Sequence, residues 1–271
     1  MKKVLLSTGA VLTLGIVFFT FNGCTLLSAA GLTSKGLPAK EVPGELTSTT
    51  ANSSVNLDHS GWTKLLQKYV DNNGDVNYKA FKNDRQELDK YLNMLSENKP
   101  TNSWSAQEQL AYYINLYNAY TVDLILKNYP LKSIKDLSGP WTKAIVPVGD
   151  VKMSLGGIEN SILRQMNEPR IHFAINCASV SCPKLLNEAF TAAKINEQLD
   201  RVTREFINSD KNTIKEGSAQ LSSIFDWYKK DYLVNGIGSV RDYVNQYSDV
   251  KINEGATITF KDYNWNLNEQ K

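Results

Sequence analysis

The chain has 271 residues, with 30 lysine and arginine residues against 28 aspartate and glutamate residues. At ~100–200 residues per domain, this length allows one large domain or two small ones. The nearly balanced charge argues against a nucleic-acid-binding protein, because such proteins need a basic excess on one face. It also gives no sign of strong electrostatic attachment of the whole protein to anionic lipid.

The N-terminal residues have the three parts of an export signal, namely two lysines, an apolar run and a small residue before Cys24. Phe21-Asn22-Gly23-Cys24 resembles a bacterial lipobox, in which the cysteine is lipidated and becomes the new N-terminus. We therefore expect residues 1–23 to be a lipoprotein signal peptide and Cys24 to anchor the chain to a membrane through a lipid. Cleavage after Ala30 and an uncleaved anchor are the alternatives. All three place the body of the protein outside the cytoplasm, and the lipid anchor places it in the cell envelope, at the outer membrane or the cell surface.

Residues 24–57 have the composition of a flexible tether. No aromatic residue occurs from Thr25 to Gly61, and serine, threonine, glycine, alanine and proline are frequent. Such a segment buries too little apolar surface to offset the entropy lost on ordering. All the tryptophans and tyrosines follow it, so we expect one folded domain over residues 58–271.

The first part of this domain is predicted to be helical. Apolar residues recur at helical spacing over Trp62–Val70, and a second helix is expected over Tyr78–Leu95. The strongest periodic pattern runs from Leu110 to Ile125 and is closed by Pro130. We expect this third helix to lie at the centre of the core.

The second part is predicted to mix short strands with helices. Strands are expected at Ala144–Val148, Val151–Leu155, Ile171–Ile175, Thr213–Lys215, Gln220–Leu221 and Thr257–Phe260. Helices are expected at Gly157–Gln165, Ile195–Ile207, Ile224–Tyr232 and Val240–Tyr247. Strands and helices do not alternate regularly, which indicates an α+β fold: a helix-rich single domain with a small, mainly antiparallel sheet.

One short segment concentrates the residue types of thiol chemistry. It contains His172, Cys177 and Cys182, and a nearby imidazole can give a cysteine the thiolate character that a nucleophile needs. On a regular strand His172 and Cys177 would point to opposite faces, so a bulge or a strand end near Asn176 is required. A structural Cys177–Cys182 disulfide and metal ligation by both cysteines with a histidine are the alternatives.

The same segment resembles the signature of the family known as domain of unknown function 547. Further matching pieces are Gly74–Tyr78, Tyr113–Ala119, Ser154–Glu159, Leu221–Tyr228 and Tyr263–Asn268, with asparagine at positions 77 and 264 where the family tends to have aspartate. The resemblance covers the whole expected domain but implies no defined activity. Its members include proteins fused to a glutaredoxin-like domain, which favours thiol chemistry by analogy.

The remaining candidates surround this segment. We expect Glu159 or Asn115 to orient His172, and we regard Asn115, Asn118, Ser179 and Cys182 as candidate binding residues. Bracing of a neighbouring loop is the alternative role of the two helical asparagines. The five tryptophans are expected to be core anchors, and His59 is expected at the surface.

The resulting hypothesis is a thiol-dependent enzyme, acting by acyl transfer, hydrolysis or thiol redox chemistry. Cys177 would be its nucleophile and His172 its base. The alternative is a non-catalytic surface-binding module stapled by a Cys177–Cys182 disulfide. No metal ion and no cofactor are expected, and the sequence leaves the substrate or protein partner unspecified.

Overall fold

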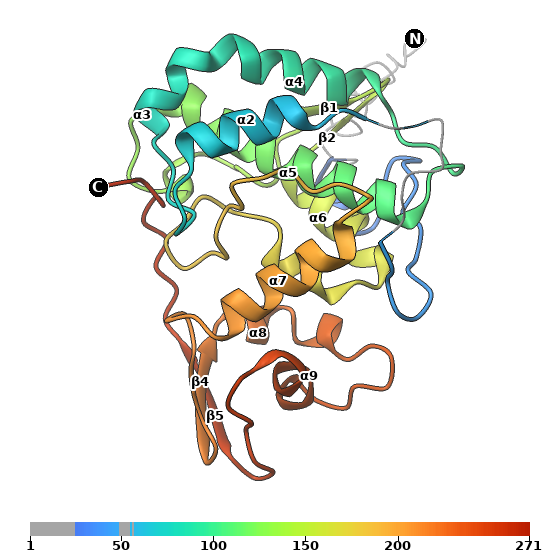
Figure 1. Cartoon of the computed structure of the whole chain (residues 1–271). Coiled ribbons are helices and arrows are strands. Elements are labelled where there is room, and N and C mark those ends of the chain that lie inside the picture. Colours follow the sequence, from blue (N-terminus) through green and yellow to red (C-terminus); the bar gives the residue numbers. More distant parts are fainter. Residues whose placement is uncertain (1–24, 49–54, 56) are drawn as a thin grey trace, which may run out of the picture.

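Helix α5 (Ala106–Asn128) is the central element of the fold (Figure 1). It starts with a capping box: the Ser105 hydroxyl accepts the Glu108 N–H, and the Glu108 carboxylate accepts the Ser105 N–H. Nearly all of its side chains are buried, as the sequence predicted for a helix in the centre of the core. The computed structural model describes residues 25–48, 55 and 57–271, so the expected signal peptide and Cys24 lie outside the described residues.

The other helices pack against α5 or against elements next to it. They are α2 (Ser60–Tyr69), α3 (Tyr78–Phe81), α4 (Arg85–Glu97), α6 (Leu155–Ser161), α7 (Ile195–Ile207), α8 (Ile224–Trp227) and α9 (Val240–Tyr247). Figure 1 shows α2 and α4 on one side of α5, with α7 on the other side. Among the residues described, no helix combines the length and the apolar character needed to cross a membrane.

The strands form two small sheets. Strands β1 (Val146–Val148) and β2 (Val151–Met153) make an antiparallel hairpin. Strand β4 (Ser218–Ser222) pairs antiparallel with β3 (Thr213–Lys215) and parallel with β5 (Thr257–Lys261). The predicted α+β class is confirmed, with the strands divided between two sheets.

The strand expected at Ile171–Ile175 is wrong, because the chain there forms a 3₁₀ helix over Pro169–Phe173. Proline at the first position favours a helical start, and the Glu168 carboxylate caps it by accepting the Arg170 N–H at 3.2 Å. The apolar run reflects burial on all sides rather than strand pairing. The strand-face argument about His172 and Cys177 therefore does not apply.

Much of the predicted tether that is described packs against the domain. Leu37, Val42 and Leu46 belong to the hydrophobic core. The Val42 N–H donates to the carbonyl of Met166 at 2.9 Å, and the Tyr113 hydroxyl donates to the carbonyl of Pro38 at 3.0 Å. A few well-spaced apolar side chains thus hold a segment whose average composition resembles a linker.

Candidate functional site

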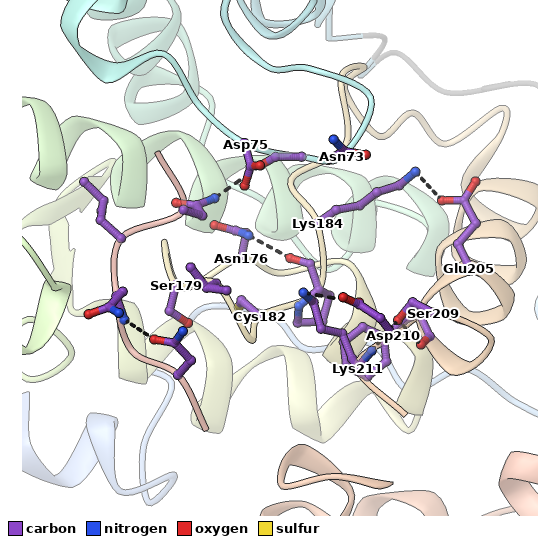
Figure 2. A pocket seen from close by; sticks show the side chains of 18 of the residues that line it. Asn73, Asp75, Asn176, Ser179, Cys182, Lys184, Glu205, Ser209, Asp210 and Lys211 are labelled. Atoms are coloured by element: carbon purple, nitrogen blue, oxygen red, sulfur yellow. Dashed lines mark hydrogen bonds and ion pairs between the residues drawn. The ribbon is translucent and has the colours of Figure 1, made fainter. Parts of the chain in front are cut away.

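Cys177 and Cys182 belong to a short loop that Asn176 closes (Figure 2). The Asn176 Nδ2 donates to the carbonyl of Pro183 at 2.7 Å, and its Oδ1 accepts the Ala178 N–H at 2.8 Å. Ala178 has a φ of 57°, in the left-handed region that alanine rarely adopts. The loop therefore brings the two cysteines together at some cost in backbone strain.

The sulfur of Cys177 has three polar neighbours. It lies 2.8 Å from the Cys182 Sγ, 3.1 Å from the Ser179 Oγ and 3.3 Å from the Tyr263 hydroxyl. Both cysteines are free, because the sulfur separation exceeds the ~2.05 Å of a disulfide bond. The described partners of this sulfur do not include His172.

The two thiols differ in accessibility and acidity. The hydrogen bond with Cys182 lowers the pKa of Cys177, and hydrogen bonds with Ser179 and Tyr263 act in the same direction against the effect of burial. Burial and the neighbouring Cys177 charge raise the pKa of Cys182 well above its usual value. Cys177 is partly exposed, whereas Cys182 is buried. The two thiols therefore differ in exposure and in acidity, although Cys182 also lines the aromatic cavity that adjoins Cys177.

An apolar cavity of about 370 Å³ adjoins Cys177. Its walls are largely aromatic and include Tyr117, Trp141, Trp227, Tyr228, Tyr263 and Trp265. Trp227 stacks on Trp265 at 5.9 Å between ring centroids, and Tyr263 lies 4.5 Å from Trp265. The expectation that all five tryptophans are core anchors is therefore wrong, because three of them line this cavity.

A second, polar cavity of about 710 Å³ lies on another side of the cysteine loop (Figure 2). Asn176, Ser179 and Cys182 line it, but Cys177 does not. Two ion pairs lie on its wall, Lys184 with Glu205 at 2.6 Å and Lys211 with Asp210 at 3.4 Å. The Cys177 thiol thus faces the aromatic cavity and not the polar one.

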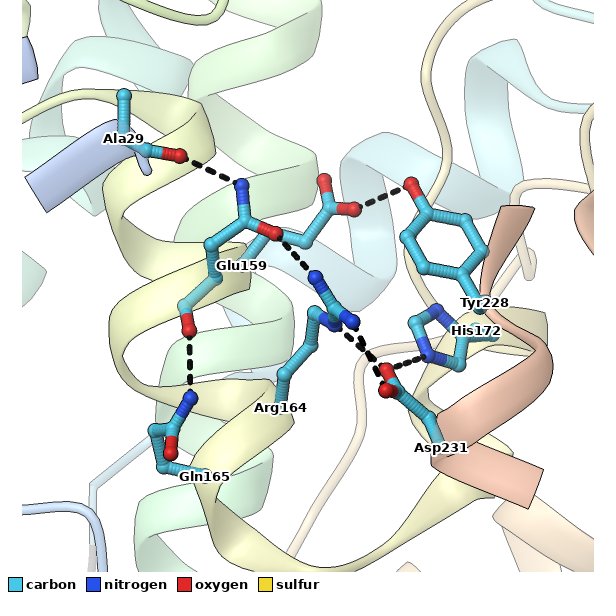
Figure 3. A network of polar contacts seen from close by, with 8 residues as sticks. Ala29, Glu159, Arg164, Gln165, His172, Tyr228 and Asp231 are labelled. Carbon is cyan, nitrogen blue, oxygen red and sulfur yellow. Dashed lines mark hydrogen bonds and ion pairs between the residues drawn. The ribbon is translucent and has the colours of Figure 1, made fainter. Parts of the chain in front are cut away.

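His172 lies in a separate polar network at the wall of the aromatic cavity (Figure 3). Its Nε2 is 2.8 Å from Asp231, and Arg164 donates to the same carboxylate at 2.5 and 2.8 Å. Burial alone would raise the pKa of Asp231, but the hydrogen bonds from Arg164 and His172 lower it to about 2. The ionised carboxylate therefore orients the imidazole as a hydrogen-bond donor from Nε2.

The residue that orients His172 is Asp231, rather than Glu159 or Asn115. Glu159 instead accepts a hydrogen bond from Tyr228 at 2.5 Å and one from Tyr117 at 3.3 Å. The Tyr228 ring stacks on His172 with 4.0 Å between centroids. Tyr228 thus links Glu159 to the imidazole. Glu159 and Cys177 both line the aromatic cavity.

The two asparagines of α5 brace loops. Asn115 exchanges two hydrogen bonds with the backbone of Phe190. Asn118 donates to the carbonyl of Ala174 at 2.9 Å and accepts the Asn176 N–H at 2.8 Å. Asn118 therefore fixes the backbone that leads into the cysteine loop, whereas Asn115 fixes a different segment.

Sequence reasoning missed Tyr228, Asp231 and Tyr263, which follow Cys182 by 46, 49 and 81 residues. Tyr228 and Tyr263 do lie within the pieces Leu221–Tyr228 and Tyr263–Asn268, which could have indicated them. Asp231 had no such signal. Among the described residues, no group of three or more histidine, cysteine, aspartate and glutamate side chains is placed to hold a metal ion.

Comparison with known proteins identifies one family. Residues 101–207 match the family model described as "Protein of unknown function, DUF547", which confirms the resemblance inferred from the sequence. The matched region contains α5, α6, the cysteine loop and α7, but not Tyr228, Asp231 or Tyr263. No curated protein and no solved structure matches the chain.

Proposed function

Because residues 101–207 belong to the DUF547 family, which has no assigned activity, we propose a function from the site itself. The proposal is a thiol–disulfide exchange enzyme in which Cys177 attacks the substrate and Cys182 resolves the product. The observation that carries it is the 2.8 Å contact between an accessible, acidified thiol and a buried one. Such pairs suit exchange, since one sulfur attacks the substrate and the other then attacks the first sulfur.

The reaction proceeds in two balanced steps. The Cys177 thiolate attacks one sulfur of a substrate disulfide, forming a mixed disulfide and releasing the other sulfur as a thiolate. Cys182 then loses its proton and attacks Cys177, forming the Cys177–Cys182 disulfide and releasing the second substrate thiolate. The substrate gains two electrons and the dithiol loses two. A small thiol or a second dithiol protein restores the reduced pair.

Three groups support the attacking thiolate. Cys182, Ser179 and Tyr263 each contact the Cys177 sulfur and can donate a hydrogen bond to its negative charge. Burial and the nearby cysteine charges raise the pKa of Tyr263, so its hydroxyl stays protonated as a donor. These donors stabilise the thiolate, which is the role that the sequence suggested for His172.

Acyl transfer or hydrolysis by Cys177 is the second candidate, and the His172–Asp231 pair is the observation that favours it. In that reaction Cys177 would attack a carbonyl carbon, His172 would exchange protons with the substrate and Cys182 would be dispensable. The non-catalytic binding module remains the third candidate, with a permanent Cys177–Cys182 disulfide and the aromatic cavity as its binding surface.

We place this activity in the cell envelope, with the chain anchored through a lipid on Cys24. The support is the lipobox-like sequence before Cys24 and the export signal that precedes it. The mass of the N-terminal peptide of the membrane-extracted protein tests the anchor. A diacylated Cys24 supports it, and a peptide that starts after Ala30 contradicts it.

A trapping experiment tests the exchange activity. The wild-type chain, Cys182→Ala and Cys177→Ser are each treated with dithiodipyridine, a neutral aromatic disulfide that suits the cavity, and analysed by intact mass. We expect Cys182→Ala to keep a mixed disulfide on Cys177, the wild type to release it and form an internal disulfide, and Cys177→Ser to form far less adduct. Equal retention by the wild type and Cys182→Ala would contradict a resolving role for Cys182.

A further inference from the structure

Residues 25–32 pack against α6 and do not form a free tether. Residues 25–29 form a short helical turn, and Ser28 is fully buried. The Ser161 hydroxyl donates to the carbonyl of Ser28, and the Asn160 Nδ2 donates to the carbonyl of Ala29 at 2.7 Å (Figure 3). The segment is therefore tied to the domain by its backbone.

The fit between this segment and α6 is close. A Cβ added at Gly157 would meet the Ser28 hydroxyl at 2.5 Å, and one added at Gly31 would meet the carbonyl oxygen of Asn160 at 3.2 Å. Glycine at these positions lets the two backbones approach. The segment thus has a fixed position relative to the wall of the aromatic cavity, which includes Gly156, Glu159 and Asn160 of α6.

The outer side of the segment is apolar and uncovered. Leu26, Leu27 and Leu32 are 57%, 46% and 71% exposed, although leucine is normally buried. They occur within seven residues of chain, so they form one exposed group rather than scattered positions. We call Leu26, Leu27 and Leu32 the leucine foot.

The charged residues that follow the leucine foot in the chain have a single sign. Residues 25–40 contain Lys35 and Lys40 and no acidic residue, although the two signs are nearly balanced over the whole chain. The Lys35 Nζ reaches back to Thr25 at 3.5 Å and to the carbonyl of Lys152 at 2.7 Å. A cation held beside exposed leucines is the pattern of a surface that meets anionic lipid headgroups.

We infer that the leucine foot inserts into the lipid bilayer and seats the domain directly on the membrane surface. The inference rests on the proposed lipid at Cys24, which immediately precedes Thr25 and would bring the bilayer to the foot. Each inserted leucine then removes apolar area from water. Because the segment is tied to α6, the domain would take a fixed orientation, with the α6 wall of the aromatic cavity next to the lipid.

Photo-cross-linking in membranes of cells that express the full chain tests this inference. The photoreactive residue benzoylphenylalanine replaces Leu27 or Leu32 in separate proteins. Matched controls carry it at Leu233 or Val250, which are 40% and 43% exposed and lie outside the foot. We expect lipid adducts at positions 27 and 32 in about tenfold greater yield than at the controls, because only the foot would lie within the bilayer.

Two results would overturn the inference: lipid adducts in equal yield at all four positions, or adducts at 27 and 32 that are only to other proteins. The mass of the N-terminal peptide shows whether Cys24 is lipidated in the same samples. The dithiodipyridine assay reads the thiol chemistry independently. A failure of the foot is therefore distinguishable from a failure of the anchor or of the exchange activity.

Discussion

The Cys177 sulfur takes its acidity from neighbouring thiol and hydroxyl groups, whereas His172 is engaged with Asp231. The sequence suggested that Cys177 and His172 act together, but each has its own hydrogen-bond partners. The thiol unit has its own donors, and the imidazole unit has its own carboxylate. Both units line one cavity, so a molecule bound there would lie beside the Cys177 thiol and the His172 imidazole.

The first prediction concerns the pKa of Cys177. Because the hydrogen bond with Cys182 is the largest influence that lowers it, Cys182→Ala should raise the pKa. The wild-type thiol should be alkylated faster at pH 7 than an ordinary cysteine of pKa ~8.5. Iodoacetamide alkylation of Cys177 as a function of pH, followed by peptide mass analysis, measures both effects.

Ser179→Ala is the matched control, because Ser179 contacts the same sulfur and has a smaller effect on its pKa. It should shift the alkylation profile in the same direction by less than Cys182→Ala does. An unchanged profile in Cys182→Ala would show that the contact between the sulfurs does not stabilise the thiolate.

Helix α5 is the element that links the core to the site. Its start and end are readable from sequence, because Ser105 and Glu108 form a capping box and Pro130 follows its end. Helices α7 and α9 were likewise predicted at their observed bounds. The strand predicted at Ile171–Ile175 failed because full burial produces the same apolar run in a 3₁₀ helix as in a strand.

The second prediction compares two asparagines of α5. Asn118→Ala and Asn115→Ala each remove two hydrogen bonds to buried backbone, so each should lower the free energy of unfolding by about 1–3 kcal/mol. Only Asn118 braces the backbone beside Asn176. Asn118→Ala should therefore also slow the alkylation of Cys177, and Asn115→Ala should not.

Urea unfolding and the rate of Cys177 alkylation at pH 7 measure the two effects separately. Asn115→Ala serves as the control for general loss of stability. Equal changes in alkylation rate in both variants would mean that the bracing of the cysteine loop does not govern the reactivity of its thiol.

At the scale of the whole molecule, the local parts of the site were predictable and the distant parts were not. Cys177, Ser179 and Cys182 lie within six residues, so their proximity follows from the sequence alone. Asp231 and Tyr263 reach the site only through tertiary packing. Tyr263 lies in the matching piece Tyr263–Asn268, whereas a single acidic residue such as Asp231 carries no positional signal. The tether expectation rested on average composition, which conceals three buried side chains at Leu37, Val42 and Leu46.

The third prediction concerns acid stability. His59 is buried rather than at the surface, and its Nδ1 lies 2.7 Å from the Tyr91 hydroxyl. Burial lowers the pKa of His59 to about 4, so the unfolded chain binds a proton that the folded chain does not between about pH 6.5 and 4. Stability present above pH 6.5 is therefore lost as the pH falls towards 4, by about 2–3 kcal/mol.

His59→Gln, which keeps a polar partner for Tyr91, should lessen this loss. Urea unfolding at several pH values from 7 to 4 gives the free energy of unfolding for the wild type and the variant. The same decline in both proteins would show that other groups cause the acid sensitivity.

We propose that Cys177 and Cys182 form a reversible redox pair. The reduction potential of this pair in glutathione buffers tests the proposal most directly. Hydrogen bonds that stabilise the reduced Cys177 thiolate should raise the potential, so we predict a value above about −300 mV and full reduction by an excess of glutathione. A disulfide with a potential below about −300 mV would contradict the account and indicate a structural staple. So would a pair that forms no internal disulfide under oxidising conditions.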